Sequence, residues 1–496
     1  MGVNIAEKTI VILGAGNAGL FAAHILKKHR PGLNIIVVGS SEVGIVGVGE
    51  SSTEHIQYIT RALGITATEM AKYTGSSYKF GVWLDWQGYD WVHSLIGDGG
   101  DYSHKYNNHG IYGAMAAGVN PLYLVPKNIV EGMIHHKQVP NQFHFDTHLL
   151  NKYLTEQAIQ KGIHVHDDVI TEFNFREDGT LESIESETAV YAGDLFFDCS
   201  GFARLLPKHV PEFEWVSQQH NMFCDRAFAF PTEHPDDDDY NYLPFTKALK
   251  MSSGWMWQIP VHHRQGNGYV YSSKHLTHDE AVAEVEEKLG HKINVAKTFE
   301  FEAGHYNKTW HKNMILCGLS SHFFEPLEAT AMGVGINQAR LALQYIAQDT
   351  YDDMLVESYN REVQHMFTQM WTFLRLHYLN AVPDSPFWED VAKAKVPDEV
   401  QKILDITKHR MLVSEDLNCN LTWYIFHELN FNQVLYAIGH MKPEMISTHQ
   451  ALSGKYANRK HPFLETPDNI KAEMMPHRKF VEGLIDGTIK TKLEIE

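Results

Sequence analysis

The sequence predicts an α/β fold with an inserted antiparallel sheet and a helical C-terminal region, and three stretches of the chain carry this prediction. Residues 9–13 (TIVIL), 18–28 and 34–38 (NIIVV) follow one another as strand, helix and strand, the order of a βαβ unit. Between about residues 205 and 310, segments such as GWMWQIPV alternate in the manner of antiparallel strands. From about residue 340 onward the apolar residues follow a helical period.

The length of the chain indicates how many domains it forms, and its net charge excludes some classes of partner. The 496 residues correspond to about three domains of average size, enough to enclose a cofactor. With 42 Lys and Arg against 61 Asp and Glu, the net charge of −19 repels nucleic-acid phosphates and anionic membrane surfaces. We therefore expect neither nucleic acid nor a membrane as a partner, and homo-oligomerisation stays open. The 10 Trp, 22 Tyr and 25 Phe suit either large cores or a pocket for a flat ligand.

The cysteines and the N-terminal segment predict the compartment. Cys199, Cys224, Cys317 and Cys419 lie far apart, and none belongs to a CxxC pair, which argues against a disulfide framework or a zinc site. The N-terminal segment shows no basic region followed by a long apolar run. No apolar run reaches the roughly 18 residues of a membrane span. We therefore expect a cytoplasmic protein.

Three glycines stand between the first strand and the first helix. Gly14, Gly16 and Gly19 form a GxGxxG pattern. In such a turn the first glycine permits a tight bend, the second lets the backbone approach a pyrophosphate, and the third lets the helix pack on the strand. The phosphates then lie at the helix N-terminus, where free amides attract anions. The pattern predicts a Rossmann-like, dinucleotide-binding core.

Two neighbouring features modify this prediction. The acidic residue that usually ends the second strand and binds a ribose hydroxyl is absent, because Gly39 stands there. Ser40 and Glu42 are the candidates to replace it. A second glycine-rich turn, GVGESS at residues 47–52, follows; its backbone can approach a ligand, and an ordinary loop is the alternative. The residues of this turn that we assign to the ligand are Gly47, Gly49 and Glu50.

A tryptophan-rich motif narrows the comparison to one family. Residues 255–260 read WMWQIP and fit the pattern WxWxIP, and here the chain resembles the flavin-dependent halogenases of the tryptophan-halogenase type. Other stretches agree in the family's order, and the last hundred residues show no clear match. The agreeing stretches are the two glycine turns, Tyr78-Lys79-Phe80, DCSGF at 198–202, FEPLEAT at 324–330, LHY at 376–378 and DSPFW at 384–388.

The resemblance implies a fold and an activity. The fold is an FAD/NAD(P)-binding core like that of p-hydroxybenzoate hydroxylase, with the antiparallel sheet on the substrate side. Residues 1–360 would form this core, with the sheet inserted at about 205–310, and residues 361–496 would form a helical region over the substrate site. The activity would be halogenation of an electron-rich aromatic small molecule, indole- or tryptophan-like or phenolic. Hypohalous acid would be made from O2 and chloride, bromide or iodide, with FAD as FADH2 supplied by a separate flavin reductase.

The resemblance also assigns two catalytic residues. Lys79 matches the family's essential lysine, which hydrogen-bonds to hypohalous acid or forms a haloamine. By spacing alone, Lys79 is an ordinary lysine that shares a strand face with Gly81 and Trp83. Glu328 matches the second catalytic residue, which polarises the hypohalous acid or accepts the proton that leaves the ring. A carboxylate favoured at a helix N-terminus is the alternative for Glu328.

The start of the helix after Glu328 is the halide site that the resemblance implies. Thr330 and Ala331 would hold the halide on backbone amides, which a helix N-terminus leaves free. The family usually has Ser-Thr-Gly where this chain has Ala329-Thr330-Ala331, which puts the geometry and the preference for one halide in question. The remaining residues assigned to the cofactor are Asp198, Gly318, Met332 and Gly333.

The tryptophan motif has two interpretations. In a strand, Trp255, Trp257 and Ile259 project to one face, and without the resemblance a buried sheet face is the simpler interpretation. In the family the motif, including Pro260, keeps the organic substrate away from the flavin. Four C-terminal aromatic residues would complete the pocket or pack in a helical core: Trp371, Tyr378, Trp423 and Tyr424.

Metal chemistry is a weaker alternative. His144 and Asp146 form an HxD pair of the kind found in non-haem iron sites. With 31 His and 61 acidic residues such pairs arise easily by chance. We therefore predict no metal.

Two further alternatives keep the flavoprotein fold. A flavin monooxygenase usually carries Gly-Asp before the flavin-facing helix, where this chain has Gly318-Leu319. A non-catalytic binding protein is compatible with Gly39. The presence of both Lys79 and Glu328 argues against it.

Overall fold

The computed structural model describes residues 8–47, 51–86, 90–94, 115, 131–135, 142–346, 352–417, 424–453 and 474–490. The chain divides into two compact units, each assembled from three separate stretches. Unit 1 comprises Met1–Ile65, Asp146–Gln218 and Glu302–Thr368, and unit 2 comprises Thr66–Phe145, Gln219–Phe301 and Gln369–Glu496. The predicted domain division at residue 360 falls within helix α9 (Asp353–His377) and stays a prediction.

A six-stranded sheet of order β20-β21-β12-β1-β2-β8 forms the centre of unit 1. It is parallel except for the pair β20 and β21, which confirms the predicted α/β class. Its strands are β1 (Thr9–Leu13), β2 (Asn34–Gly39), β8 (His164–Asp167), β12 (Leu195–Asp198), β20 (Trp310–His311) and β21 (Met314–Leu316). The other strands of unit 1 are β9 (Ile170–Phe175), β10 (Leu181–Ser186), β11 (Val190–Ala192), β13 (Trp215–Ser217), β19 (Gly304–Tyr306) and β22 (His322–Phe323). Its helices are α1 (Asn17–His29), α2 (Ile56–Leu63), α6 (Thr147–Gln160), α8 (Thr330–Ile346) and the first part of α9.

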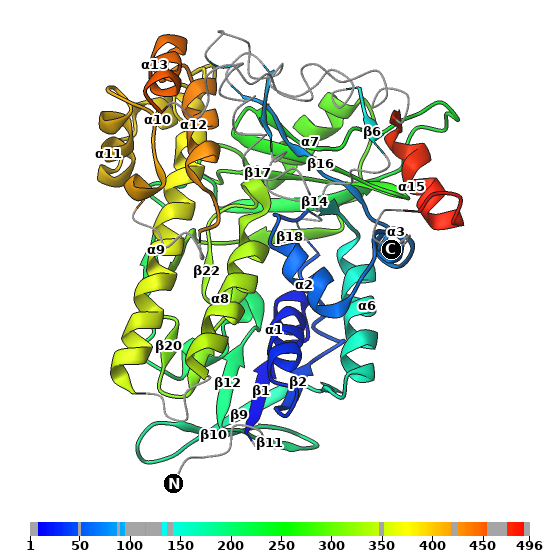
Figure 1. Ribbon diagram of the computed structural model, residues 1–496, viewed down its shortest axis with the longest axis vertical. Helices are drawn as coiled ribbons and strands as arrows, with labels where there is room; N and C mark the ends of the chain where they lie inside the picture. The colour runs from blue at the N-terminus through cyan, green and yellow to red at the C-terminus, as the bar shows by residue number, and fades with distance from the viewer. Residues whose placement is uncertain are drawn as a thin grey trace. The chain divides into compact units, whose positions relative to one another are not determined.

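The first 40 residues form the predicted βαβ unit. Strands β1 and β2 pair in parallel, with Ile10 opposite Ile35 and Leu13 opposite Val38. The apolar residues of β1 are buried because a central parallel strand is covered on both faces. Helix α1 connects the two strands and packs against α8 and α6, as Figure 1 shows.

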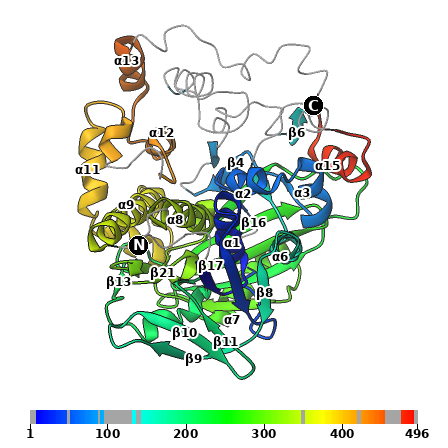
Figure 2. The same ribbon diagram turned by 60° about the horizontal axis from the view of Figure 1, so that its bottom comes forward.

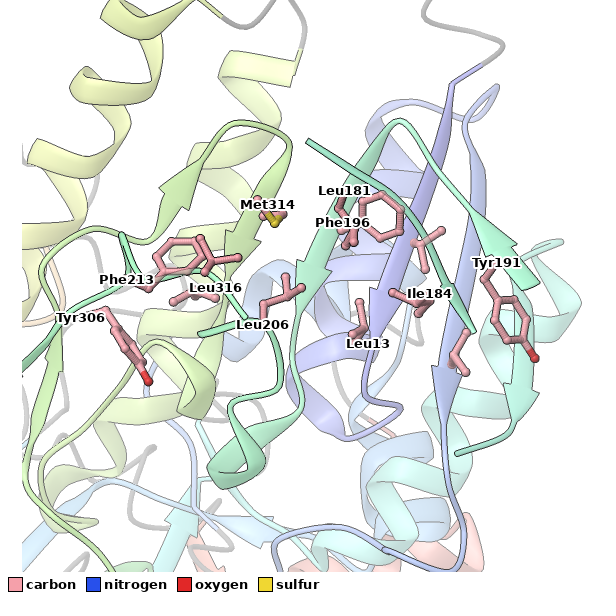
Figure 3. Close-up of a cluster of buried hydrophobic side chains, with 13 residues drawn as sticks. Leu13, Leu181, Ile184, Tyr191, Phe196, Leu206, Phe213, Tyr306, Met314 and Leu316 are labelled. Carbon is pink, nitrogen blue, oxygen red and sulfur yellow. The ribbon is translucent and has the colours of Figure 1, made fainter. Parts of the chain in front are cut away.

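A buried apolar cluster holds the small antiparallel sheet β9-β10-β11 against the central sheet of unit 1. Figure 3 shows Leu13, Phe196 and Leu316 of the central strands facing Leu181 and Ile184 of β10. All five side chains are almost fully buried. Each contributes about 1.5 to 3 kcal/mol to folding, so this cluster anchors the strands from whose ends the glycine turn and the segment after β12 emerge.

A seven-stranded sheet of order β18-β14-β17-β16-β15-β4-β5 forms the centre of unit 2. All neighbours pair antiparallel except β15 and β4, which are parallel. Five of its strands lie within the region predicted to form an antiparallel sheet, whereas β4 and β5 join from the N-terminal part of the chain. Its strands are β4 (Gly81–Asp85), β5 (Asp90–Ser94), β14 (Arg226–Thr232), β15 (Phe245–Met251), β16 (Gly254–Val261), β17 (Arg264–Tyr271) and β18 (Lys297–Glu300).

Helices and two short ladders complete unit 2. Two two-stranded ladders pair β3 (Ser77–Tyr78) with β7 (Phe143–His144), and β6 (Met133–His135) with β23 (Met474–Pro476). The helices are α3 (Ala67–Thr74), α7 (His278–Leu289), α10 (Pro386–Lys393), α11 (Asp398–Ile406), α12 (Glu428–Ala437), α13 (Pro443–Ser453), α15 (His477–Asp486) and the end of α9. The C-terminal region is helical, as predicted. Figure 2 shows α15, in red, beside α3, in blue, and the two helices are in contact.

Among the described residues, no helix combines the length and the hydropathy that crossing a membrane requires.

Candidate active site

The three glycines of the first turn differ in what surrounds them. Gly14 has φ +105°, and a Cβ placed on it would lie 2.3 Å from the Cys199 carbonyl oxygen. A Cβ on Gly19 would lie 2.0 Å from the Gly14 carbonyl oxygen, so helix α1 packs directly on the turn. A Cβ on Gly16 would meet nothing within 4 Å. Gly16 begins α1 without a side-chain cap, so open space lies beside uncapped helix amides. This arrangement fits a pyrophosphate group.

The end of β2 explains the missing acidic residue. A Cβ on Gly39 would lie 2.5 Å from the Ala15 backbone nitrogen, so no side chain fits there. The hydroxyl of Ser40 accepts a hydrogen bond from the Glu42 amide at 3.2 Å. The carboxylate nearest in register is Asp167 of β8, opposite Gly39. Its two oxygens accept hydrogen bonds from the Ser41 amide and hydroxyl at 2.7 and 2.6 Å. The cofactor assignment of Ser40 stays a prediction.

Other predicted cofactor residues of unit 1 lie where segments approach each other closely. A Cβ on Gly318 (φ +68°) would lie 2.8 Å from the Ala18 methyl group of α1. A Cβ on Gly333, in the first turn of α8, would lie 2.7 Å from Thr53 Oγ1. A Cβ on Gly47 would lie 2.9 Å from His148 Nε2. These close approaches bring the segments around residues 18, 53, 318 and 333 together at the N-terminal ends of α1 and α8. Met332 is half-buried there, and Gly49 and Glu50 lie outside the described residues.

Asp198 uses its carboxylate to hold the turn after β12. The side chain is fully buried, and its oxygens accept hydrogen bonds from the Ser200 and Leu206 amides, both at 2.8 Å. Burial raises the pKa of Asp198, while these hydrogen bonds oppose the rise. The geometry assigns Asp198 a structural task, and its predicted contact with the cofactor stays a prediction.

The turn before α8 has an unusual backbone. Glu328 and Ala329 both have positive φ, +65° and +57°, which is uncommon for residues other than glycine. The Ala329 amide donates a hydrogen bond to the Pro326 carbonyl at 3.1 Å, and α8 begins at Thr330. The Glu328 side chain is 4% exposed. The turn thus places a buried carboxylate directly before the first amides of a 17-residue helix.

Lys79 lies between two strands rather than within one. Strand β3 ends at Tyr78 and β4 begins at Gly81. The Lys79 amide donates to the Gln142 carbonyl at 3.0 Å, and the Phe80 amide donates to the Pro244 carbonyl at 2.8 Å. Consecutive amides of an extended chain point to opposite sides, so these two bonds to different segments are compatible with the alternation predicted from Lys79 to Trp83. The predicted shared face of those two residues stays a prediction.

Lys79 is fully buried. None of its surface is exposed, whereas most lysines in proteins are solvated. Its positive charge is felt by His144, whose pKa lies well below the ordinary value because of burial and then because of Lys79. His144 is therefore a neutral imidazole near neutral pH. Buried charges of this kind are concentrated at functional sites.

A hydrogen-bond network links the Lys79 segment to the tryptophan motif. Ser77 Oγ donates to the Pro260 carbonyl at 2.5 Å and lies 3.3 Å from His144 Nδ1. His144 Nε2 lies 3.0 Å from Thr246 Oγ1. Both ring nitrogens of His144 therefore have hydrogen-bond partners, and Asp146 caps α6 through the amides of residues 148 and 149. Among the residues that the structure describes, no three His, Cys, Asp or Glu side chains are grouped to hold a metal ion.

The tryptophan motif forms one face of strand β16. Trp255, Trp257 and Ile259 are buried, and the Trp255 and Trp257 ring centres lie 6.2 Å apart. Met256 packs instead with the apolar cluster on the other face. A Cβ on Gly268, opposite Trp257 on β17, would lie 2.1 Å from the Trp257 ring, so the ring lies directly over that glycine. The predicted alternation along the motif is confirmed.

The C-terminal aromatic residues supply partners for this face. Trp86 lies with its ring centre 6.1 Å from that of Trp255, and 5.4 Å from those of both Tyr378 and Trp388. The Trp388 indole donates to the Met251 carbonyl at 2.7 Å. Tyr378 is 1% exposed and packs within this group, and Trp371 is 4% exposed. The Tyr424 ring meets the His427 ring edge to face, with 5.7 Å between the ring centres. Trp423 lies outside the described residues.

Sequence reasoning missed two residues that support these sites. Asn151 of α6 donates to the Ala15 carbonyl at 2.9 Å and so holds the glycine turn. His477 of α15 accepts a hydrogen bond from the Tyr78 amide, one residue before Lys79. The HxD pair of His144 and Asp146 is the sequence feature nearest to Asn151, because Asp146 caps the helix that carries it. No signal in the sequence marks His477.

The comparison with known families decides what these sites belong to. A family model described as tryptophan halogenase matches residues 9–453. The chain belongs to the tryptophan halogenase family. It is accordingly an enzyme, a flavin-dependent halogenase, and the non-catalytic alternative is not supported.

Curated members of the tryptophan halogenase family match most of the chain. The tryptophan 7-halogenase RebH of Lentzea aerocolonigenes is 29% identical over 439 residues, which cover 82% of each chain. The tryptophan 6-halogenase ThaL of Streptomyces albogriseolus is 27% identical over 470 residues, which cover 86% of each chain.

Solved structures of halogenases share the fold. A tryptophan C-6 flavin-dependent halogenase from taromycin biosynthesis superposes with a TM-score of 0.84 at 24% identity, covering 96% of this chain and 99% of that one. A flavin-dependent halogenase from Xanthomonas campestris has a TM-score of 0.77 at 26% identity, covering 97% and 95%. These likenesses confirm the predicted fold class.

Proposed function

We propose that this halogenase uses O2 and a halide ion to make hypohalous acid, and transfers the halogen through Lys79 to an electron-rich aromatic small molecule. The observation that carries the proposal is the fully buried Lys79 in a segment hydrogen-bonded to the WxWxIP strand. A buried ammonium whose neighbouring histidine, His144, is neutral is suited to donate a hydrogen bond to a small neutral acid.

The residues of the glycine turn are those that would hold FAD. The uncapped first amides of α1 and the open space at Gly16 suit the pyrophosphate, and the close approaches at Gly318 and Gly333 leave room for the backbone only. Bound FADH2 would supply two electrons. In the overall reaction, FADH2, O2, one halide ion and one proton would give FAD, hypohalous acid and water. Thr330 and Ala331 would hold the halide on the first amides of α8, and a separate flavin reductase would supply the FADH2.

The transfer step uses two side chains of the protein. Lys79 donates a hydrogen bond to the oxygen of hypohalous acid and makes the halogen more electrophilic. The carbon–halogen bond forms as the oxygen–halogen bond breaks, and the oxygen takes a proton from the Lys79 ammonium and leaves as water, after which Lys79 is protonated again from solvent. Glu328 accepts the proton that leaves the ring carbon. Trp255 and Trp257 form a wall that lets only the small acid approach the organic substrate.

The substrate is an indole or a phenol, and tryptophan-like molecules are the first candidates to test. The names of the relatives, tryptophan 7-halogenase and tryptophan 6-halogenase, support an indole. The test is to incubate the protein with FAD, a flavin reductase, NADH and a panel of indoles and phenols, with chloride, bromide or iodide. Halogenated mass shifts that require a halide are expected. Hydroxylated products without halide dependence would instead identify a monooxygenase.

Replacing Lys79 by Met tests the transfer step. Methionine keeps the length of the side chain but removes the ammonium, so we expect the halogenated aromatic product to fall on the order of a thousandfold. Free hypohalous acid, captured with a 1,3-diketone trap, should still form at the wild-type rate. Lys72→Ala, at an exposed position of α3, is the matched control and should change neither rate. Retained turnover in Lys79→Met would refute the proposal.

Replacing Glu328 by Gln tests the acid–base role. Glutamine has nearly the same shape but cannot accept the ring proton, so aromatic halogenation should fall about a hundredfold. An unchanged rate would remove Glu328 from the mechanism.

A further inference from the structure

The C-terminal helix α15 lies beyond the part of the chain that the family model matches, which ends at residue 453. Strand β23, just before it, pairs with β6 within unit 2. The His477 amide donates a hydrogen bond to the Gly132 carbonyl at 2.7 Å. The first residue of α15 is therefore held by backbone hydrogen bonds on its N-terminal side.

The imidazole of His477 has one defined protonation state. Its Nδ1 lies 3.1 Å from the Tyr242 carbonyl oxygen, which can only accept, so Nδ1 carries the proton. Its Nε2 then accepts a hydrogen bond from the Tyr78 amide at 2.9 Å. Burial lowers the pKa of His477 to about 3, so the ring stays neutral at working pH.

The Tyr78 amide is the first of three consecutive amides that hold the lysine segment. The amides of Tyr78, Lys79 and Phe80 donate to His477, to the Gln142 carbonyl and to the Pro244 carbonyl. The Tyr78 ring packs 5.4 Å from the ring of Phe480 on α15 and 5.3 Å from that of Phe143 on β7. Three separate segments of unit 2 therefore fix the backbone on both sides of the buried Lys79 Cα.

We propose that His477 is a positioning residue for Lys79, so that the C-terminal helix is a working part of the halogen-transfer site. The inference rests on the role proposed for Lys79. Loss of the His477 acceptor would leave a buried amide without its partner, and the segment would move to satisfy it. Displacement of a reacting group by about 1 Å costs on the order of a hundredfold in rate.

Two substitutions separate the two hydrogen bonds of His477. His477→Asn places an amide near Nδ1, so it keeps the donor to Tyr242 and removes the acceptor for Tyr78. His477→Gln places an amide oxygen near Nε2, so it keeps the acceptor for Tyr78. We expect His477→Asn to lower kcat for aromatic halogenation about ten- to a hundredfold with little change in KM. His477→Gln should restore it to within about threefold, and trapped hypohalous acid should stay at the wild-type rate in both.

Controls distinguish positioning from general damage. Lys479→Ala, on the exposed side of α15, should match the wild type in every assay. Equal loss of trapped hypohalous acid and aromatic product in His477→Asn would indicate a merely structural role and overturn the inference, as would wild-type kcat in that variant. If His477→Asn does not fold, Phe480→Leu tests the inference in its place. This variant loosens the packing on the Tyr78 ring and keeps every hydrogen bond. It should lower kcat a few-fold with hypohalous acid unchanged, and unchanged kcat would overturn the inference.

Lys79→Met in the same assays separates this inference from the proposed function. If Lys79→Met loses aromatic halogenation while His477→Asn does not, the proposed function stands and the role of His477 is refuted. If Lys79→Met keeps full turnover, the proposed function itself fails.

Discussion

Two residues before α8 adopt a backbone that side chains disfavour. Glu328 and Ala329 have φ of +65° and +57°, and left-handed backbone costs a residue other than glycine roughly 1 to 2 kcal/mol. The turn leaves Glu328 buried just before the first amides of α8. Strain of this kind persists where the surrounding fold enforces it, and it is concentrated at functional sites. The sequence marked Glu328 through its motif, but EPLEAT contains no glycine that would have revealed the turn.

Ala329→Gly tests whether this strain is real. Glycine adopts positive φ without the steric cost, and this gain exceeds its loss of chain entropy, so the free energy of unfolding should rise by about 1 kcal/mol. Ala283→Gly, at an exposed position within α7, is the control and should lower it by about 1 kcal/mol. Urea denaturation of both variants measures the two changes. A loss of stability in Ala329→Gly as large as in the control would contradict the strain.

At the scale of elements, the three glycines of the β1–α1 connection have different surroundings and therefore different roles. Gly14 and Gly19 are closed in by backbone atoms, whereas Gly16 faces open space at the start of α1. The pattern GxGxxG predicts all three residues because their spacing is local. It does not predict why β2 ends in Gly39. That residue is required by contact with Ala15, 24 positions earlier, and contacts of this kind leave no period in the sequence.

A pair of alanine substitutions tests this division of tasks. Gly16→Ala should leave the stability of the FAD-free protein within about 0.5 kcal/mol, because the methyl group meets no protein atom. It should weaken FAD binding at least about tenfold, because the methyl group occupies ligand space. Gly19→Ala should lower stability by about 1 to 3 kcal/mol through overpacking. Flavin fluorescence titration and urea denaturation give the two quantities, and tight FAD binding by Gly16→Ala would contradict the assignment.

At the scale of the whole molecule, buried neutral histidines make stability depend on pH. Burial lowers the pKa of His24 to about 4 and that of His322 and His477 to about 3, and it lowers the pKa of His144 as well. Below pH 6.5 these histidines bind protons in the unfolded chain but stay neutral in the folded protein. The free energy of unfolding therefore falls as the pH drops from about 6.5 towards the folded pKa values. Above pH 6.5 these groups contribute no pH dependence.

The size of this effect can be isolated with one variant. At pH 5, which is 1.5 units below 6.5, each fully buried histidine of this kind costs about 2 kcal/mol. His477→Gln removes one titrating group, so its loss of stability between pH 7 and pH 5 should be about 2 kcal/mol smaller than that of the wild type. Changes in the −19 net charge cancel in this comparison, because both proteins share them. Identical losses would show that His477 is not held neutral by the fold.

The sequence by itself determined the βαβ unit, the glycine turn, the alternation of Trp255 and Trp257, and the family. Each of these is local or periodic, so the order of residues carries it. Only the tertiary structure decided that β4 and β5 complete the sheet of unit 2, and that Lys79 lies in a break between strands. It alone decided that His477 accepts a hydrogen bond from Tyr78, 399 residues away. Such contacts depend on how distant segments satisfy each other's buried polar groups, and neither composition nor spacing records that choice.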